Sequence, residues 1–452
     1  MTNHYCDLKN ADVILIMGSN AAEHHPIAFK WILRAKEKGA TIIHVDPRYT
    51  RTSARCDFHV PLRSGTDIAF LGGMIHYILE NKKFFKDYVL NYTNASFIVD
   101  NGFNFKDGLF SGYDPKKRKY DKATWVFDKD GKGIPQRDMS LTHPRSVFQL
   151  LKKHYSRYTL DKVSSITGVS KENLLKVYEI YASTGVPDKA GTECYALGWT
   201  HHTTGSQNIR TMSIIQLLLG NMGIAGGGIN ALRGEPNVQG STDHCILYGN
   251  LPGYLKMLSA SLDTLDKYLH KYTPESKDPQ SANYYSNYPK FFVSFLKSLW
   301  EDKATKENAF GYSWLPKMDD GKHYSTMHMF DAMYAGKVKG YFCVGADTAV
   351  STPNSNKVRK AMENLDWLVG ENIFDNETHS FWKGPGVDPK KIKTECFLLP
   401  AAATMEKEGS QSNSGRWVQW KYKADEAPSD SLPVGELEIE IMAADKKLYE
   451  RE

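Results

Sequence analysis

The sequence predicts an α/β protein built from two related Rossmann-like, doubly wound domains. A buried apolar strand followed by a glycine-containing turn occurs near the start of the chain, at Val13–Met17, and again near the end, at Gly340–Val344. Each is followed by a helical pattern and a second strand, which is the pattern of a parallel sheet with crossover helices. The long separation of the two units excludes a solenoid of short repeats.

The first unit is predicted to contain a strand, a helix and a second strand. Val13–Met17 forms the first strand and ends at the turn residues 18–20. Pro26 suits the first turn of the helix that follows, and Gly39 suits its C-terminal cap. Thr41–Val45 forms the second strand, so this stretch is a βαβ unit.

The second unit repeats this order near the other end of the chain. Gly340–Val344 is the first strand, and Trp367–Val369 is a strand that leads to Gly370, Glu371 and Asn372. Between them, Asn354 or Ser355 can cap a helix that continues through Leu365.

The region between the units is expected to be mainly helical. Leu160–Leu219 has a largely helical pattern, and Ser206 can cap its last helix. That helix stops at a glycine cluster within residues 220–228. Residues 101–140 are rich in Asp, Gly and Lys and form a predicted surface insertion.

Three domain segments follow from this pattern. Residues 1–235 form the first α/β domain and residues 236–395 the second. After Pro385 the α/β pattern fades, so residues 396–452 are expected to be a separate, partial segment. Its end, Gly435–Glu452, has a helical pattern.

Composition excludes several classes of protein. The 452 residues are 41% apolar and 24% charged, which excludes a mainly disordered chain. The net charge of +5 indicates no nucleic-acid partner. Apolar runs such as Ile214–Leu219 are too short to cross a bilayer, and no export signal is expected before Asp12. The six cysteines form no CxxC pair, so no zinc ribbon or complete local iron–sulfur motif is expected.

Candidate binding residues follow the predicted strands, where open α/β sheets bind ligands. Gly18 and Gly345 allow a backbone to approach a phosphate or a ring. Asp46 ends the second strand, where an acid commonly holds a ribose hydroxyl, and Asp347 and Glu371 are its counterparts. The alternative, that these glycines only turn the chain and the acids only cap helices, stays open. Neither unit has GxGxxG, so an ordinary nicotinamide site is not favoured.

A second candidate is Arg233, which follows the glycine-rich stretch 226–228. A partly buried arginine stays charged and can bind a carboxylate through two parallel hydrogen bonds. The alternative is an internal ion pair with an acid such as Asp243. The pairs His24-His25 and His201-His202 lack the spacing of a zinc site.

Six segments occur along the chain in this order: GSNAAEHHP (18–26), VDPRYTRTSARCD (45–57), LRSGTDIAFL (62–71), ALGWTHHTTGSQNIRT (196–211), LLLGNMGIAGGGINALRGEPNVQG (217–240) and GSQSNSGRWVQW (409–420). Together they resemble the molybdopterin-dependent oxidoreductases, and most closely the catalytic subunits of respiratory formate dehydrogenases of the nitrate-inducible, membrane-associated type. The resemblance covers essentially the whole chain.

The resemblance implies the fold of the dimethyl sulfoxide reductase type and two molybdopterin guanine dinucleotides that together hold molybdenum or tungsten. One dinucleotide would be bound by Gly18, Asn20, Glu23, Asp46, Arg48, Gly65, Thr66 and Asp67. The other would be bound by Gly345, Asp347, Ser351 and Glu371. Gly198, Trp199, His201 and Gly234 would lie near a pterin or its phosphates. Arg233 matches the arginine that orients formate at the metal.

The implied reaction is the oxidation of formate to carbon dioxide, with electrons passed to iron–sulfur clusters. The implied partners are an iron–sulfur beta subunit and a membrane cytochrome b gamma subunit, and the implied location is the periplasm. A [4Fe–4S] domain and a metal-ligating selenocysteine or cysteine are expected upstream of Met1, so no metal ligand is assigned within this chain. We therefore expect the middle of a longer subunit, inactive alone, with Met1 following a UGA codon misread as a stop.

Two alternatives stay open at this point. The chain could belong to another molybdopterin oxidoreductase, such as a nitrate or polysulfide reductase, since these share the fold. It could also be a non-catalytic remnant.

Overall fold

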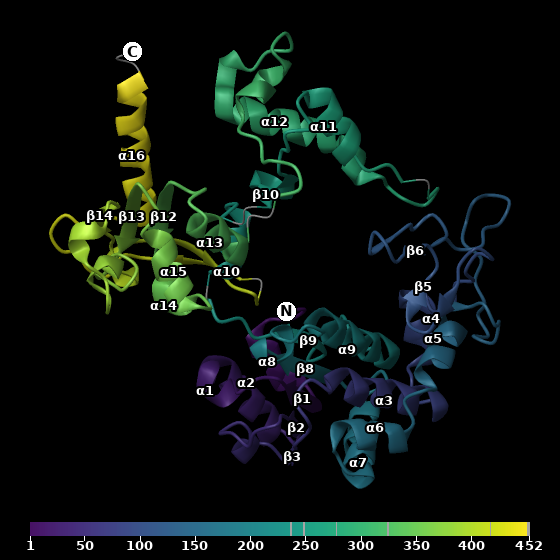
Figure 1. The fold of residues 1–452 in the computed structure, drawn as a ribbon. Coiled ribbons are helices and arrows are strands. Elements are labelled where there is room, and N and C mark those ends of the chain that lie inside the picture. The colour runs from purple at the N-terminus through teal and green to yellow at the C-terminus, as the bar shows by residue number, and fades with distance from the viewer. Residues whose placement is uncertain (236, 247–248, 277, 323–324, 416, 450–452) are drawn as a thin grey trace. The chain divides into compact units, whose positions relative to one another are not determined.

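The computed structural model describes residues 1–235, 237–246, 249–276, 278–322, 325–415 and 417–449 (Figure 1). The chain forms two compact units. Unit 1 comprises Met1–Gln239, Pro274–Ser286 and Ser412–Trp417. Unit 2 comprises Gly240–Thr273, Asn287–Gln411 and Val418–Glu452. The three domain segments 1–235, 236–395 and 396–452 stay a prediction.

Unit 1 is built on a five-stranded parallel sheet with the order β3-β2-β1-β8-β9. The strands are β1 (Val13–Met17), β2 (Thr41–Val45), β3 (Phe58–Val60), β8 (Gly191–Tyr195) and β9 (Gly228–Ala231). Met17 lies opposite Val45 on one side and Tyr195 on the other. All five strands therefore end at the same edge of the sheet, and the predicted strands β1 and β2 are confirmed.

The side chains of β1 alternate between two hydrophobic cores, one on each face of the sheet. Ile14 and Ile16 pack in the core that holds the buried face of α2 (Pro26–Glu37). Leu15 packs in the other core, with α3 (Asp67–Glu80) and α9 (Gly205–Leu219). The strand is buried on both faces, as expected for a doubly wound parallel sheet.

The predicted ends of α2 are also confirmed. Pro26 is the first helical residue, and Gly39 follows the helix with φ +97°. Apart from short strands within residues 101–140, the remaining elements in residues 1–243 are η1 (Tyr5–Asn10), α1 (Ala21–His24), η2 (Ser53–Arg55), α4 (Lys86–Tyr92), α5 (Val147–Tyr155), α6 (Leu160–Thr167), α7 (Lys171–Ala182), α8 (Leu197–Thr200) and α10 (Val238–Asp243).

Two details of the predicted helical region are wrong. Leu160–Leu219 contains the buried strand β8, which pairs with β1 and β9. Helix α9 begins at Gly205 after the N-cap residue Thr204, so Ser206 lies inside the helix. The helix ends at Gly220, whose φ of +73° is the left-handed conformation that favours glycine.

Residues 101–140 form turns and the short strands β4 (Phe105–Lys106), β5 (Leu109–Phe110), β6 (Tyr113–Asp114) and β7 (Lys119–Tyr120). Most of their side chains are exposed. This agrees with the predicted surface insertion.

Unit 2 contains a second parallel sheet, with β13 (Trp367–Asn372) between β12 (Gly340–Val344) and β14 (Glu395–Pro400). Helices α13 (Thr326–Tyr334) and α15 (Ser355–Met362) share one core with β13. Strand β14 corrects the expectation that the α/β pattern fades after Pro385.

The predicted cap of α15 is confirmed, because the Asn354 side chain accepts a hydrogen bond from the Lys357 amide. The helix ends at Met362 rather than at Leu365. The predicted terminal helix is α16 (Val434–Tyr449), and residues 450–452 lie outside the described residues.

Unit 2 also holds a helical cluster that the sequence analysis did not predict. Helices α11 (Leu265–Tyr272) and α12 (Tyr288–Trp300) pack around Tyr268, Phe292 and Tyr312. The other elements of this part of the chain are β10 (Asn250–Leu251), η3 (Pro252–Tyr254), β11 (Leu255–Lys256), η4 (Tyr284–Asn287), η5 (Glu301–Lys303), η6 (Ala309–Trp314), α14 (Thr348–Ser351), η7 (Phe381–Lys383), η8 (Pro389–Lys391), η9 (Thr404–Glu406), β15 (Gly409–Ser412) and β16 (Val418–Lys421). Within the described ranges, no helix has the length and apolar character needed to cross a bilayer.

Candidate functional site

A cavity of about 420 Å³ lies at the carboxyl edge of the unit 1 sheet. It is formed by the segments that follow β1, β2, β8 and β9, together with the start of α2. Its lining residues are Gly18, Ser19, Asn20, His24, His25, Asp46, Ala196, Leu197, Gly198, Leu232 and Gly234. The structure thus brings together five of the predicted residues: Gly18, Asn20, Asp46, Gly198 and Gly234.

The cavity lies where the strand order reverses. From β1, the chain adds β2 and β3 on one side of the sheet, and later β8 and β9 on the other side of β1. Open α/β sheets bind ligands at this point. Gly18 follows β1 with φ +61°, and the Gly198 amide donates a hydrogen bond of 3.0 Å to the Gly18 carbonyl. A Cβ atom on Gly18 would lie 2.8 Å from the Trp199 nitrogen, so the two loops meet only because both residues are glycines.

Asn20 and Glu23 form one hydrogen-bonded group beside the cavity. The Asn20 amide donates to the Glu23 carboxylate, and the Thr52 hydroxyl donates to Asn20 Oδ1 at 2.9 Å. Glu23 also lies 3.3 Å from Arg51 Nε. Asn20 lines the cavity, and Glu23 fixes the position of the Asn20 side chain. The sequence did not predict this role of Glu23.

Asp46 follows β2 and lines the cavity. The Arg48 amide donates to Asp46 Oδ1 at 2.9 Å, while the Arg48 side chain is exposed. One carboxylate oxygen is thereby oriented by the backbone. This arrangement suits a carboxylate that accepts a hydrogen bond from a ligand hydroxyl.

His44, on β2, fixes the loop after β1. Its Nε2 donates to the Ser19 carbonyl at 3.2 Å, and its Nδ1 accepts from the Ser53 hydroxyl at 2.7 Å. Burial lowers the pKa of His44 to about 4, although the nearby Asp46 opposes this change. The neutral imidazole therefore acts as a rigid link between the two loops that line the cavity.

Gly65, Thr66 and Asp67 lie at the start of α3 and are not lining residues of the cavity. Asp67 is buried, and Trp199 Nε1 donates to its Oδ1 at 3.1 Å. Burial raises the pKa of Asp67, and this hydrogen bond opposes the rise. Asp67 therefore positions Trp199, which directly follows Gly198.

Arg233 lies between two lining residues, Leu232 and Gly234. Its side chain is exposed rather than partly buried, and its carbonyl oxygen lies 2.9 Å from His25 Nε2. Among the described residues of unit 1 its guanidinium has no ion-pair partner. The alternative partner Asp243 accepts a hydrogen bond from the Tyr254 hydroxyl.

The charge of Arg233 acts on two phenols. Burial raises the pKa of Tyr5 and of Tyr195, and the positive charge of Arg233 opposes both rises. His201 caps the end of α8, is exposed and does not line the cavity.

The sequence analysis missed three polar residues of the cavity, Ser19, His24 and His25. Ser19 Oγ and His25 Nδ1 are buried and have no hydrogen-bond partner among the described residues. Buried polar atoms normally have partners, so these two are suited to a ligand. In the sequence, Ser19 could have been found from its position directly after Gly18, and His25 from its position directly before Pro26. Bare glycine backbone, an oriented carboxylate and two unpaired polar atoms together fit a large nucleotide-containing group.

In unit 2, the four predicted residues meet at the carboxyl ends of β12 and β13. The Gly345 amide donates to the Glu371 carbonyl at 2.9 Å, and Gly345 has φ +60°. Asp347 Oδ1 accepts from the Thr378 hydroxyl at 2.7 Å and from the Thr378 amide at 3.1 Å. Ser351 donates to the Asp347 carbonyl at 2.8 Å. Asp347 thus holds the loop that follows β13.

Glu371 is fully buried, and neither carboxylate oxygen has a hydrogen-bond partner among the described residues. Burial raises its pKa, and the charge of Glu438 raises it further. A buried carboxyl without a partner is costly, so a ligand that donates a hydrogen bond to it would relieve this cost.

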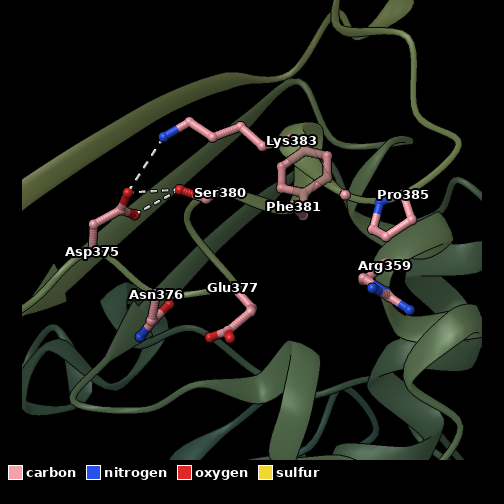
Figure 2. Close-up of a pocket in the computed structure, with 9 residues that line it drawn as sticks. Arg359, Asp375, Asn376, Glu377, Ser380, Phe381, Lys383 and Pro385 are labelled. Carbon is pink, nitrogen blue, oxygen red and sulfur yellow. Dashed lines mark hydrogen bonds and ion pairs between the residues drawn. The ribbon is translucent and has the colours of Figure 1, made fainter.

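Unit 2 contains a cavity of about 440 Å³, which lies at the loop after β13 (Figure 2). It is lined by Arg359 and by residues between Asp375 and Pro385, and none of the predicted site residues is among them. Asp375 accepts hydrogen bonds from Ser380 and lies 3.5 Å from Lys383 Nζ (Figure 2). Because Asp375 is already neutralised inside the loop, we assign this cavity no role. Over the described ranges, no group of three or more His, Cys, Asp or Glu side chains is arranged to hold a metal ion.

Residues 1–380 match the model of the molybdopterin oxidoreductase family. The chain is 61% identical over 448 residues to the formate dehydrogenase subunit alpha of Megalodesulfovibrio gigas, covering 99% of this chain and 44% of that protein. It is 50% identical to the major subunit of the nitrate-inducible formate dehydrogenase of Escherichia coli K12, covering 100% of this chain and 45% of that one. The chain therefore spans somewhat less than half the length of these relatives.

A solved structure, acetylene hydratase from Pelobacter acetylenicus, has the same fold with a TM-score of 0.52. The match covers 96% of this chain and 48% of that one, at 17% sequence identity. This likeness concerns the fold alone.

Proposed function

The chain belongs to the molybdopterin oxidoreductase family, and we propose that it is the central part of a formate dehydrogenase catalytic subunit. The carrying observation is the match to formate dehydrogenase alpha and major subunits over almost every residue of this chain, at 50–61% identity. The complete subunit would oxidise formate to carbon dioxide, releasing two electrons and one proton. The electrons would pass to iron–sulfur clusters.

We propose that each unit binds one molybdopterin guanine dinucleotide within the dimethyl sulfoxide reductase type of fold. The cavity of unit 1 supports this, since it is lined by Gly18 and Gly198 and holds the unpaired polar atoms of Ser19 and His25. Asp46 would accept a hydrogen bond from a ribose hydroxyl. When bound with molybdenum or tungsten, this cofactor supplies the acceptor for the two electrons.

In unit 2, Glu371 and the loop held by Asp347 would bind the second dinucleotide. The unpaired oxygens of Glu371 support this assignment, since a guanine or ribose donor would satisfy them. Gly345 and Ser351 would line the same site. Residues 1–235 and 236–395 would then be the two cofactor domains, and 396–452 would pack on further domains.

Arg233 would bind the substrate carboxylate. Its guanidinium has no ion-pair partner among the described residues of unit 1, and its carbonyl oxygen is held by His25. A guanidinium binds a carboxylate through two parallel hydrogen bonds, which fixes the orientation of the C–H bond. Arg233 would therefore position formate without taking part in proton transfer.

The remaining proposals concern the complete subunit. Its metal would be ligated by a selenocysteine or cysteine and accompanied by a [4Fe–4S] cluster, both supplied by the rest of the subunit. It would work with an iron–sulfur beta subunit and a membrane cytochrome b gamma subunit in the periplasm.

The nucleotide proposal can be tested on this chain by calorimetric titration with guanosine diphosphate. We expect saturable binding that is weakened about tenfold in Asp46→Asn, because one oriented acceptor is lost. Asp114→Asn, in the surface insertion, is the matched control and should bind as the unchanged chain does. Equal affinities for guanosine diphosphate in all three proteins would contradict the Asp46 assignment.

The activity proposal is tested on the complete subunit, using formate and an artificial electron acceptor. We expect Arg233→Lys to raise KM for formate and lower kcat/KM by about 10²-fold or more, since a lysine cannot form two parallel hydrogen bonds. Turnover of nitrate but not formate by the unchanged subunit would refute the proposal.

A further inference from the structure

Unit 1 has a second cavity, of about 390 Å³, between the insertion and helix α5. None of the residues predicted to bind the cofactor lines it. Its lining residues are Phe103, Asn104, Phe105, Lys106, Asp107, Pro144, Arg145, Leu150, Lys153, His154 and Arg157. Four of these are basic (Lys106, Arg145, Lys153 and Arg157) and only Asp107 is acidic.

Aromatic rings pack against one another at this cavity. The rings of Phe105 and His154 pack with centroids 4.8 Å apart, and Phe110 stacks on Phe105 at 4.8 Å. Burial lowers the pKa of His154, and the charge of Arg157 lowers it further. His154 is therefore neutral, and the positive charge of the cavity comes from the lysines and arginines.

Arg145 contributes a fixed positive charge. Its guanidinium donates to the backbone carbonyls of Val99, Asp100 and Phe103. These contacts hold the segment that forms one wall of the cavity, but they supply no negative charge. No carboxylate of a described residue therefore compensates the charge of Arg145.

Three further cations lie at the rim. Lys106 comes from β4, and Lys153 and Arg157 come from the end of α5 and the turn after it. Arg157 Nε donates to the His154 carbonyl at 3.0 Å, which leaves its two terminal nitrogens without a partner among the described residues. Neither lysine forms an ion pair with a described residue, whereas the neighbouring Lys152 lies 3.7 Å from Glu80.

We propose that this cavity is a binding site for a compact, multiply charged anion of the phosphate type. Four cations around one concavity repel each other, and a ligand that carries two or more negative charges relieves that repulsion. The free terminal nitrogens of Arg157 suit two oxygens of a phosphate group. The Phe105 ring already packs against the rings of Phe110 and His154, so we assign recognition to the phosphate group.

The test uses this chain with sodium phosphate and pyrophosphate at constant ionic strength, measured by calorimetry and by the shift of the melting temperature. The test variant is Lys153→Gln with Arg157→Gln, both on exposed side chains. Lys116→Gln with Lys117→Gln removes the same charge from two residues of the insertion that do not line the cavity, and is the matched control. Formate and chloride at equal ionic strength distinguish site binding from general screening.

We expect saturable binding that is tighter for pyrophosphate than for phosphate, with a rise in melting temperature. The test variant should lose about tenfold or more in affinity, and the control should change less than about twofold. Three results would overturn the proposal: no saturable binding, an equal loss in both variants, or equal binding of formate and chloride. The site does not depend on the proposed formate dehydrogenase activity.

Discussion

The amide of Gly198 donates a hydrogen bond of 3.0 Å to the carbonyl of Gly18, and neither residue has space for a Cβ atom. A Cβ atom on Gly198 would lie 2.7 Å from Gly18 Cα. The loops after β1 and β8 are thus in backbone contact at the point where the strand order reverses. This contact forms the base of the unit 1 cavity.

We expect Gly198→Ala to destabilise unit 1 by about 2–4 kcal/mol, because the new methyl group forces the two loops apart. Urea denaturation followed by circular dichroism measures this change in the free energy of unfolding. Gly131→Ala, at a glycine with nothing within 4 Å, is the control and should have almost no effect. If the two variants were equally stable, the loops would have to be free to separate.

His44 is expected to make stability depend on pH. Its pKa is about 4 in the folded chain and 6.5 in an unfolded chain, so the unfolded state binds the extra proton between these values. Its contribution is complete above pH 6.5 and is lost as the pH falls towards 4, by about 2 kcal/mol between pH 6.5 and 5. His44→Gln should flatten this slope, whereas His270→Gln, on an exposed surface, should leave it unchanged. Identical slopes in urea midpoints for the two variants would contradict this assignment.

The elements that could be predicted from the sequence are those whose apolar pattern and turn residues agree. β1, β2 and β12 have the predicted bounds because each is an apolar run that ends at a turn. β8 was missed because GTECY carries a glycine and a glutamate, and its burial depends on pairing with β1 and β9. Such pairing is a tertiary property that no local pattern contains.

Part of the cavity lining could be predicted from residue type and position after a predicted strand, as for Gly18 and Asp46. Gly198 also lines the cavity, but it was named only from the family resemblance, because the strand before it was not predicted. The binding roles of these residues stay a prediction. The roles of Ser19 and His25 were not predictable, because the unpaired state of their buried atoms depends on the surrounding structure. The exposure of Arg233 likewise could not be read from its apolar neighbours.

Glu193, in the centre of β8, is expected to reduce stability at neutral pH. It is fully buried, its oxygens have no partner among the described residues, and burial raises its pKa well above the usual value of 4.5. The folded chain therefore retains a proton that the unfolded chain loses, so its contribution to stability falls as the pH rises above 4.5. We expect Glu193→Gln to stabilise the chain by about 1–3 kcal/mol at pH 8 and by much less at pH 4.5. Glu235→Gln, on the surface, is the control, and a gain independent of pH would contradict the assignment.

Trp199 and Asp67 are expected to be energetically coupled. Trp199 Nε1 is the side-chain donor to the buried Asp67 carboxylate, at 3.1 Å. Trp199→Phe leaves that carboxylate without this partner and should cost about 1–3 kcal/mol. A double-mutant cycle with Asp67→Asn, measured by urea denaturation, should give a coupling energy of about 1 kcal/mol or more. Trp125→Phe combined with Asp67→Asn is the control cycle, because Trp125 donates to Ser111 in the insertion. Additive effects in the Trp199 cycle would show that this hydrogen bond does not hold α8 against α3.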